Sequence, residues 1–190
     1  MEMKGSQTEK NLMKAFAGES QARNRYTYYA AAALKEGFVQ ISNLFQETAD
    51  NEKEHAKVFF KLLDGGMVEF TATYPAGPIG DTATNLLAAA DGEKEEWGTL
   101  YPDFADVAKE EGFPKVSATF RKIADVEVYH ERRYRKLLAN LEAGLIFKRD
   151  ESVHWKCANC GYVHEGAEAP LECPACKHPQ AYYEILCENY

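Results

Sequence analysis

The sequence predicts a mainly α-helical protein in which a four-helix bundle precedes a small, β-rich metal-binding domain. Four long segments that favour helix fill most of the first 145 residues, and each carries apolar side chains at helical spacing. All five cysteines lie in the last 34 of the 190 residues. We therefore expect two domains, residues 1–145 and residues 146–190.

Glycine and proline set the expected helix ends. A glycine directly after a helix-favouring segment is typical of a helix C-terminus, as at Gly37, Gly65 and Gly144. Asp81 or Thr82 can cap the third helix, which Pro102 is expected to kink or interrupt. The expected helices cover residues 6–36, 38–64, about 82–111 and about 115–143.

The two halves of the helical region resemble each other. "KEGF" at residues 35–38 matches "EEGF" at residues 110–113, an offset of 75, and Glu-x-x-His recurs with the same offset at residues 52–55 and 127–130. This repetition indicates a duplicated helical hairpin. The irregular stretch 65–80 would then be a long connection that crosses the bundle between the hairpins.

One glutamate lies at the centre of the apolar face of each expected helix, because residues about 3.6 apart share a face. These four are Glu19, Glu52, Glu93 and Glu127. His55 and His130 share the faces of two of them, since residues i and i+3 are neighbours. Buried carboxylates are paired or bind metal, and Glu and His suit iron or manganese. A Glu on each of two helices with Glu-x-x-His on the other two is typical of a dinuclear metal centre.

A purely structural alternative would pair these glutamates with Arg23, Arg121 or Lys14, but it does not explain why the pattern occurs on all four helices. Glu96 breaks the symmetry of the duplication, because the first helix has an alanine at the matching position. It shares the inward face and is therefore a seventh potential ligand, which could compete with His55 for one metal. Its alternative role is that of a carboxylate beside the ligands or at the surface.

Two Cys-x-x-Cys pairs, twelve residues apart, predict one tetrahedral metal site. They consist of Cys157, Cys160, Cys173 and Cys176. A domain of roughly 40 residues has too little core to fold unaided, so the metal is expected to hold it together. The spacing fits zinc or iron, and the sequences "CGY" and "CPAC" with nearby aromatic residues favour iron over a zinc ribbon. Cys187 is left over and is expected to be an inert thiol.

The charge of the chain argues against several partners. A formal net charge of −8 and a pI of about 5.2 disfavour binding to nucleic acid or to anionic membranes. No apolar run approaches the roughly 20 residues of a membrane span, and the N-terminus lacks the apolar core of a secretory signal. We therefore expect a cytoplasmic protein whose cysteines stay reduced.

Over essentially the whole chain, these motifs resemble those of the rubrerythrin family. They are Glu19, Glu52-x-x-His55, Glu93-x-x-Glu96, Glu127-x-x-His130 and the two cysteine pairs. The resemblance implies a ferritin-like four-helix bundle with a di-iron centre, followed by a rubredoxin-like domain in which four cysteines hold one iron. It also implies a non-haem iron peroxidase that reduces hydrogen peroxide to water in defence against oxidative stress.

The resemblance further implies a role for each ligand. Glu52 and Glu127 would bridge the irons, Glu19 and Glu93 would be terminal ligands, and His130 would hold one iron. Electrons would return through the cysteine site, from rubredoxin or an NAD(P)H-dependent reductase. Family members pair head to tail as homodimers, so electrons would pass between subunits.

The remaining site residues also follow from the resemblance. The second iron would exchange Glu96 for His55 on reduction, and Tyr26 and Tyr101 would hydrogen-bond to ligand carboxylates. The helical periodicity supports the placement of Tyr26 but does not clearly aim Tyr101 at the centre.

Three other functions are compatible with the residues. The first is iron oxidation and storage, although storage needs no built-in one-electron carrier. The second is a zinc-ribbon binding module attached to a structural bundle. The third is oxygen activation for hydroxylating or desaturating an organic substrate, which requires an apolar pocket.

Overall fold

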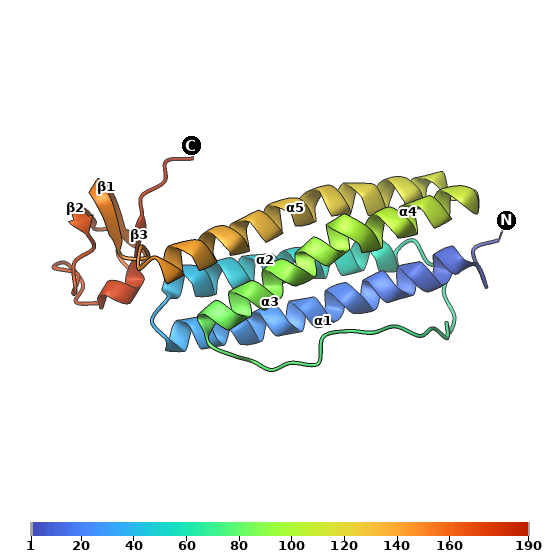
Figure 1. Ribbon diagram of the computed structural model, residues 1–190, viewed down its shortest axis with the longest axis horizontal. Helices are drawn as coiled ribbons and strands as arrows, with labels where there is room; N and C mark the ends of the chain where they lie inside the picture. The colour runs from blue at the N-terminus through green and yellow to red at the C-terminus, as the bar shows by residue number, and fades with distance from the viewer. Residues whose placement is uncertain (1, 190) are drawn as a thin grey trace.

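The computed structural model describes residues 2–189 and has a long helical bundle with a three-stranded sheet at one end (Figure 1). The helical elements are α1 (Gln7–Lys35), α2 (Val39–Phe60), α3 (Thr82–Glu95), the π-helical segment η1 (Glu96–Leu100), α4 (Tyr101–Glu110) and α5 (Pro114–Glu142). α1 packs mainly on α2, whereas α3 and α4 pack on α5. The expected bundle of two helical hairpins is therefore confirmed.

The two ends of α1 and the start of α3 lie within one residue of the predicted positions. The side chain of Ser6 caps α1 by accepting a hydrogen bond from the N–H of Glu9 at 3.0 Å. Asp81 caps α3 in the same way, accepting from the N–H of Thr84 at 2.8 Å. After α1, Gly37 has a φ of 87°, a left-handed conformation that glycine adopts without steric cost.

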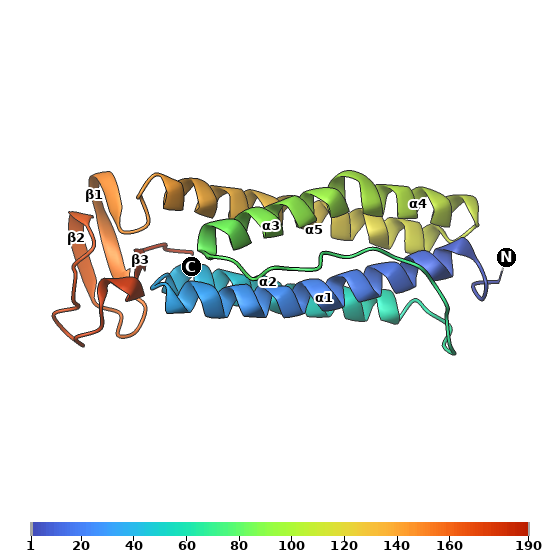
Figure 2. The ribbon, with the colours of Figure 1, turned by 60° about the horizontal axis from the view of Figure 1, so that its bottom comes forward.

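α2 ends at Phe60, earlier than the sequence predicts. The N–H groups of Leu62 and Leu63 donate to carbonyl oxygens three residues back, at 3.1 and 3.3 Å, so the last turn tightens and the α-helix stops. The chain then runs back along the bundle beside α1 to the start of α3 (Figure 2). Tyr74 fixes this crossing segment by donating from its hydroxyl to the carbonyl oxygen of Lys14 at 2.7 Å.

The third long arm of the bundle is interrupted, but the interruption begins at Glu96, six residues before the proline that predicts it. The N–H of Tyr101 donates to the carbonyl oxygen of Glu96, five residues back, which defines a π turn. Pro102 explains the wider turn, because it has no N–H and its ring crowds the carbonyl group four residues earlier. The helix therefore contains one residue more than a regular α-helix of the same length.

Two aromatic-rich apolar clusters fill the bundle. Phe45 and Tyr134 lie in the first, with ring centroids 5.1 Å apart, and Phe59 and Phe120 lie in the second, at 5.0 Å. On every helical arm, the predicted ligand glutamate lies between residues of the first cluster and residues of the second. The apolar clusters therefore close both ends of a buried polar layer at mid-bundle.

The C-terminal strands form an antiparallel sheet in the order β2-β1-β3. The strands are β1 (Lys148–Cys157), β2 (Val163–Glu168) and β3 (Tyr183–Ile185), with a short 3₁₀ helix η2 (Gln180–Tyr182) before the last. The sheet adjoins the α1–α2 turn, where Phe147 stacks on Phe38 with ring centroids 6.3 Å apart. The small β-rich domain is confirmed, and its exact boundary after residue 145 stays a prediction. Within residues 2–189, each helix is too short or too polar to span a membrane.

Candidate metal centres

Side chains from α1, α2 and α5 converge around His55. Its Nδ1 atom lies 2.8 Å from Glu52 Oε2, 2.9 Å from Glu127 Oε1 and 4.0 Å from Glu19 Oε1. Ligand atoms of these four residues all lie within 4.8 Å of one another. His55 Nδ1 carries at most one proton, so it can donate a hydrogen bond to only one of the three carboxylates around it. A cation bound between the imidazole and the carboxylates would contact all of them.

A second group surrounds His130. Its Nδ1 atom lies 2.7 Å from Glu127 Oε2, 3.1 Å from Glu52 Oε1 and 3.7 Å from Glu93 Oε2. Glu52 and Glu127 belong to both groups, and each turns one oxygen toward each histidine. Glu93 belongs to this group alone and Glu19 to the first alone. The arrangement thus has two carboxylates that can bridge two positions and one terminal carboxylate at each.

The hydrogen bonding of the cluster tests whether cations fit these positions. Buried polar atoms normally have hydrogen-bond partners, and buried charges are paired or bind metal. Several buried atoms of this cluster make no hydrogen bond of acceptable geometry, although some lie within 3.1 Å of an oppositely charged partner. They are Glu19 Oε2, Glu52 Oε1, Glu93 Oε2, both carboxylate oxygens of Glu127, and His130 Nδ1. Two cations bound between the groups would satisfy these atoms and offset the repulsion of the carboxylates.

The surroundings of the cluster shift the pKa values of its terminal carboxyl groups and its imidazole groups upward. Burial raises the pKa of Glu19 well above its usual range and the pKa of Glu93 to about 8, and neighbouring carboxylates add to both shifts. Burial opposes charging of His55 and His130, but the surrounding carboxylates outweigh it and raise their pKa values to about 10 and about 12. Metal binding should therefore release protons from these groups.

Two buried tyrosines orient the terminal carboxylates. Tyr26 on α1 donates to Glu93 Oε1 at 2.6 Å, and Tyr101 at the start of α4 donates to Glu19 Oε1 at 2.5 Å. Each tyrosine therefore reaches from one hairpin to the glutamate of the other. Burial and the adjacent carboxylates raise the pKa of both phenols, so both remain hydrogen-bond donors.

The π turn explains why helical periodicity does not predict that the side chain of Tyr101 faces the Glu/His cluster. The offset between the two halves is 74 for Glu19 and Glu93 but 75 for Tyr26 and Tyr101. The extra residue of η1 lies between Glu93 and Tyr101 and rotates the following residues by about 100°. The change in offset from 74 to 75 is a sequence signal that could have revealed this insertion.

Glu96 lies on the π turn, beside the cluster but outside both groups of converging ligand atoms. Burial raises its pKa well above the usual range, and the charges of Glu93 and Glu127 add to the shift. After burial, the charge of Glu96 makes the largest contribution to the raised pKa of Glu19. Glu96 is therefore close enough to act on the cluster, but this conformation places His55 among the carboxylates instead.

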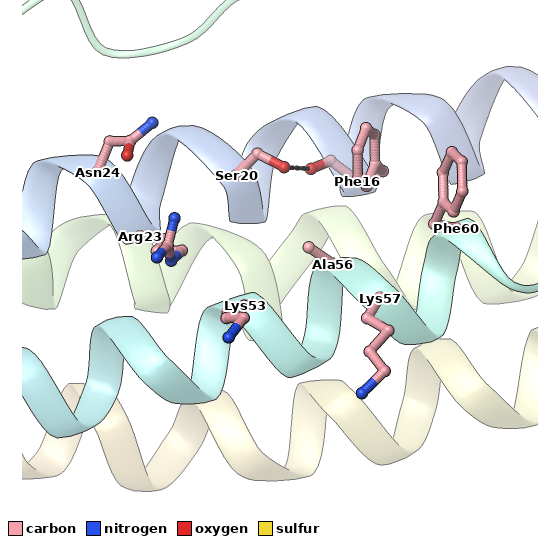
Figure 3. Close-up of a pocket in the computed structure, with 8 residues that line it drawn as sticks. All are labelled: Phe16, Ser20, Arg23, Asn24, Lys53, Ala56, Lys57 and Phe60. Carbon is pink, nitrogen blue, oxygen red and sulfur yellow. Dashed lines mark hydrogen bonds between the residues drawn. The ribbon is translucent and has the colours of Figure 1, made fainter.

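The structure does not support the purely structural role for the four glutamates. Arg121 pairs with Asp106 at the surface, and Lys14 lies beside the crossing segment. Arg23 lines an outer groove of about 380 Å³ between α1 and α2, where Phe16 and Phe60 form apolar walls (Figure 3). Within residues 2–189, none of the ion pairs of the glutamates involves these three cations.

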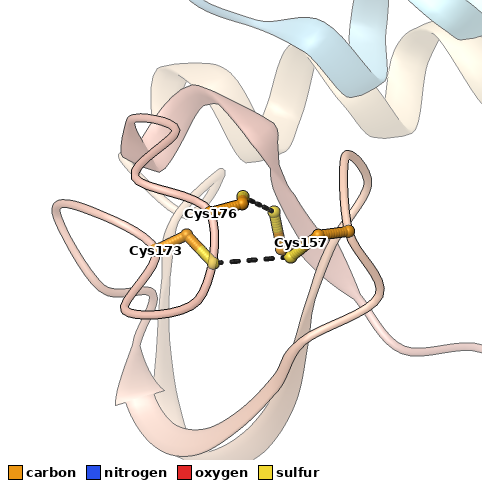
Figure 4. A group of neighbouring side chains, drawn as sticks. Cys157, Cys173 and Cys176 are labelled. Atoms are coloured by element: carbon orange, nitrogen blue, oxygen red, sulfur yellow. Dashed lines mark hydrogen bonds between the residues drawn. The ribbon is translucent and has the colours of Figure 1, made fainter.

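The two cysteine pairs meet at the sheet and form a second candidate centre (Figure 4). Sγ of Cys157 lies 3.8 Å from Sγ of Cys176, and Sγ of Cys160 lies 3.7 Å from Sγ of Cys173. Thiolates bound at about 2.3 Å to a tetrahedral ion lie about 3.8 Å apart, so the sulfur atoms have the spacing of a metal site. Cys187 is exposed and lies outside this group.

Backbone turns hold the two cysteine pairs in matching conformations. The N–H of Gly161 donates to the carbonyl oxygen of Cys157 at 2.8 Å, and the N–H of Lys177 donates to that of Cys173 at 2.9 Å. Both donors have a positive φ, 80° for Gly161 and 62° for Lys177. A backbone hydrogen bond at His178 lowers the pKa of Cys176 to about 6, which favours the thiolate form that metals bind.

Two family models match the chain. The model described as "Rubrerythrin" matches residues 10–138, and the model described as "Rubrerythrin, rubredoxin-like domain" matches residues 155–184. The chain belongs to the rubrerythrin family. The rubrerythrin of Porphyromonas gingivalis is 60% identical over 99% of this chain and 94% of its own length. The rubrerythrin of Nitratidesulfovibrio vulgaris is 53% identical over 99% of this chain and 98% of its own length.

Solved structures support the same fold. A nigerythrin in a mixed-valence state is 32% identical and covers 96% of this chain and 87% of its own, with a TM-score of 0.64. An open-pore ferritin from Archaeoglobus fulgidus covers 75% of this chain and 88% of its own with a TM-score of 0.63, but at 16% identity it shows the ferritin-like fold alone.

Family and geometry together identify the two centres. The Glu/His cluster is the di-iron site of a ferritin-like bundle, and the four cysteines are the single-iron site of a rubredoxin-like domain. The chain is therefore a non-haem iron oxidoreductase of a family that acts with electron donors.

Proposed function

We propose that this protein is a peroxidase that reduces hydrogen peroxide to water and so protects the cell against oxidative stress. The observation that supports this function best is the presence of two different iron sites in one chain. A carboxylate cluster for two irons can deliver two electrons to a substrate, and a four-cysteine iron site can return them one at a time. Iron storage needs no such carrier.

The reduction requires two electrons and two protons for each peroxide, which becomes two waters. The two irons, when bound, supply the electrons that break the O–O bond. Glu52 and Glu127 would hold both irons, because each spans the two groups of ligand atoms. Tyr26 and Tyr101 would keep the terminal carboxylates oriented through their hydrogen bonds.

Glu96 and His55 would alternate as ligands of one iron. Two features support this proposal: His55 Nδ1 lies among three carboxylates, and Glu96 lies on the neighbouring π turn, where its charge helps to raise the pKa of Glu19. A carboxylate favours the more highly charged ferric ion, and a neutral imidazole suits the ferrous ion. Exchange between them would adapt the site to each oxidation state.

Electrons would enter at the cysteine site from rubredoxin or from a separate NAD(P)H-dependent reductase. The β-rich domain adjoins Phe38, and Glu52 lies 14 residues further along α2, about 21 Å along the helix axis. This separation favours transfer from the cysteine site of another subunit in a head-to-tail homodimer. None of the five cysteines forms a disulfide, and the cytoplasm that we propose as the compartment would keep them reduced.

The decisive experiment follows the visible spectrum of the anaerobically reduced protein after stoichiometric hydrogen peroxide. The ferric-thiolate absorption should return within seconds and much faster than with dioxygen, because the two sites are coupled. A faster return with dioxygen would favour oxygen activation, and cage assembly with iron uptake would favour storage. A permanently colourless, zinc-containing cysteine site would remove the electron-transfer part of the proposal.

A variant tests the role of Glu96 separately. Glu96→Ala should leave iron content and folding intact and slow peroxide turnover, because His55 would remain without its alternative. Unchanged turnover would exclude Glu96 from the mechanism while leaving the peroxidase activity in place.

A further inference from the structure

A pocket of about 330 Å³ lies between α1, the crossing segment and the π turn. Lys14, Gln21 and Arg25 line it from α1, and residues 71–75 form its roof. On the opposite side, Glu96 lines it from the π turn, one helical turn after the predicted ligand Glu93. The outer groove of Figure 3, by contrast, has none of the predicted ligands in its lining.

The walls of this pocket have two kinds of surface. The guanidinium group of Arg25, which donates to Gln21 Oε1 at 2.6 Å, supplies hydrogen-bond donors, and its charge acts on Glu96. Leu100 and Phe104 supply apolar surface. Small-molecule pockets combine apolar walls with a few polar groups and begin at roughly 300 Å³, whereas hydrogen peroxide has only two heavy atoms. The pocket is therefore larger than hydrogen peroxide requires.

The roof is fastened at one point. Tyr74 donates to the carbonyl oxygen of Lys14, and its ring lies 3.6 Å from where a Cβ on Gly18 would be. A glycine at this position lets the aromatic ring pack closely on α1. The segment 71–75 is thus fixed over the pocket by a contact that single substitutions can remove.

We propose that this pocket binds small organic hydroperoxides and leads them to the di-iron cluster past Glu96. The inference rests on the proposed peroxidase function and extends its substrate class. The polar groups would bind the hydroperoxide end, and Leu100 and Phe104 would contact a short alkyl group. The reaction takes up two electrons and two protons, breaks the O–O bond, and yields one alcohol and one water.

Gly92 provides a way to fill the pocket. It is helical, it lines the pocket, and a Cβ there would meet only Arg25, at 3.9 Å. Gly92→Trp should therefore occupy the space, while Gly92→Ala adds one methyl group and is the matched control. Removing the roof contact with Tyr74→Ala should have the opposite effect on access. Iron content and thermal unfolding of each variant report whether the cluster and the fold are intact.

The test compares tert-butyl hydroperoxide with hydrogen peroxide as oxidants of the reduced protein. The unmodified chain should react with both, and Gly92→Trp should slow the reaction with tert-butyl hydroperoxide at least about tenfold, and more than the reaction with hydrogen peroxide. Tyr74→Ala should speed the reaction with tert-butyl hydroperoxide. Azide binding to the oxidised protein is the readout without turnover. Gly92→Trp should slow azide association and dissociation together and leave Kd nearly unchanged.

Two results would overturn the inference. One is failure of tert-butyl hydroperoxide to oxidise the unmodified chain while hydrogen peroxide does so, which leaves the peroxidase function standing. The other is Gly92→Trp with full iron content and unchanged rates for both the organic hydroperoxide and azide. Reaction of the unmodified chain with dioxygen but with neither peroxide would instead refute the peroxidase function itself.

Discussion

Tyr101 donates a hydrogen bond to Glu19 from a helix that gained one residue just before it. Its counterpart Tyr26 makes the same bond to Glu93 from an uninterrupted helix. The two bonds are equivalent under the duplication, although the helices that carry the tyrosines differ. The second half of the bundle therefore carries Glu96 on the π turn and still keeps the tyrosine contact.

Tyr101→Phe should weaken the di-iron site without unfolding the bundle. The phenyl ring keeps its packing against Phe59 and Phe120, but Glu19 loses its hydrogen-bond donor. Loss of such a supporting contact typically costs about 10- to 100-fold in metal affinity or activity. Iron content and peroxide turnover check this, and Tyr26→Phe is the matched variant in the other hairpin. Full affinity and turnover in both variants would show that these hydrogen bonds are dispensable.

Deletion of Gly98 tests the π turn directly. Removing one residue from η1 should restore a regular helix and rotate the residues that follow by about 100°. Tyr101 and Phe104 are buried in the unmodified chain, and the deletion would turn them away from the core. We expect loss of about 3 kcal/mol or more of unfolding free energy and loss of bound iron. Deletion of Gly66 in the crossing segment is the control, and an equal effect there would mean that the π turn has no special role.

Helical periodicity predicts the parts of the site that lie on regular helices. It places Glu19, Glu52 and Glu127 correctly on inward faces, because their helices are regular and each apolar stripe is continuous. It does not predict the inward position of Tyr101, because it assumes a constant rotation of about 100° per residue, which an inserted π turn interrupts. Pro102 predicts an interruption of the helix but not its position, because the helix widens in the turn before the proline, at Glu96–Leu100.

The arrangement around the histidines is also beyond the reach of periodicity. A helical wheel shows that His55 and His130 share faces with glutamates, but it contains no distances between helices. That Glu52 and Glu127 each reach both histidines depends on how α2 and α5 face each other across the bundle. The resemblance to rubrerythrins implies this bridging, and the geometry of the side chains supports it.

Glu52→Gln should remove the di-iron site and leave the cysteine site intact. The amide keeps the shape of the side chain but cannot supply two anionic oxygens to two cations. We expect about one iron per chain in place of about three, with the ferric-thiolate colour retained. Metal analysis and the visible spectrum measure both. The same substitution at the exposed Glu54 should change neither, and three irons in Glu52→Gln would contradict the ligand assignment.

The metal-free protein should lose stability as the pH rises. The pKa of Glu19 is raised, and the pKa of Glu93 is raised to about 8. Above about pH 4.5 the unfolded chain loses these protons while the folded state keeps them, so folding becomes less favourable as the pH rises. His55 and His130, with pKa values of about 10 and about 12, act in the same direction above about pH 6.5. The unfolding temperature without metal should therefore fall between about pH 5 and pH 9.

Iron should reduce this dependence, because cations then replace the protons of the folded cluster, and unfolding no longer releases those protons. Thermal unfolding of metal-free and iron-loaded protein over the same pH range provides the comparison. A metal-free protein that becomes more stable toward pH 9 would contradict the raised pKa values of the cluster.

Cys176→Ser should unfold the β-rich domain and leave the bundle folded. The domain has a small core around Trp155 and Tyr183, so the four-cysteine metal contributes much of its stability. The bundle has its own two apolar clusters and should keep its helical circular dichroism and its di-iron site. Cys187→Ser is the control, because this exposed thiol lies outside the metal group.

Peroxide should still oxidise the chemically reduced di-iron site of Cys176→Ser, but turnover with an external electron donor should stop. Continued turnover would mean that electrons reach the bundle without passing through the cysteine site.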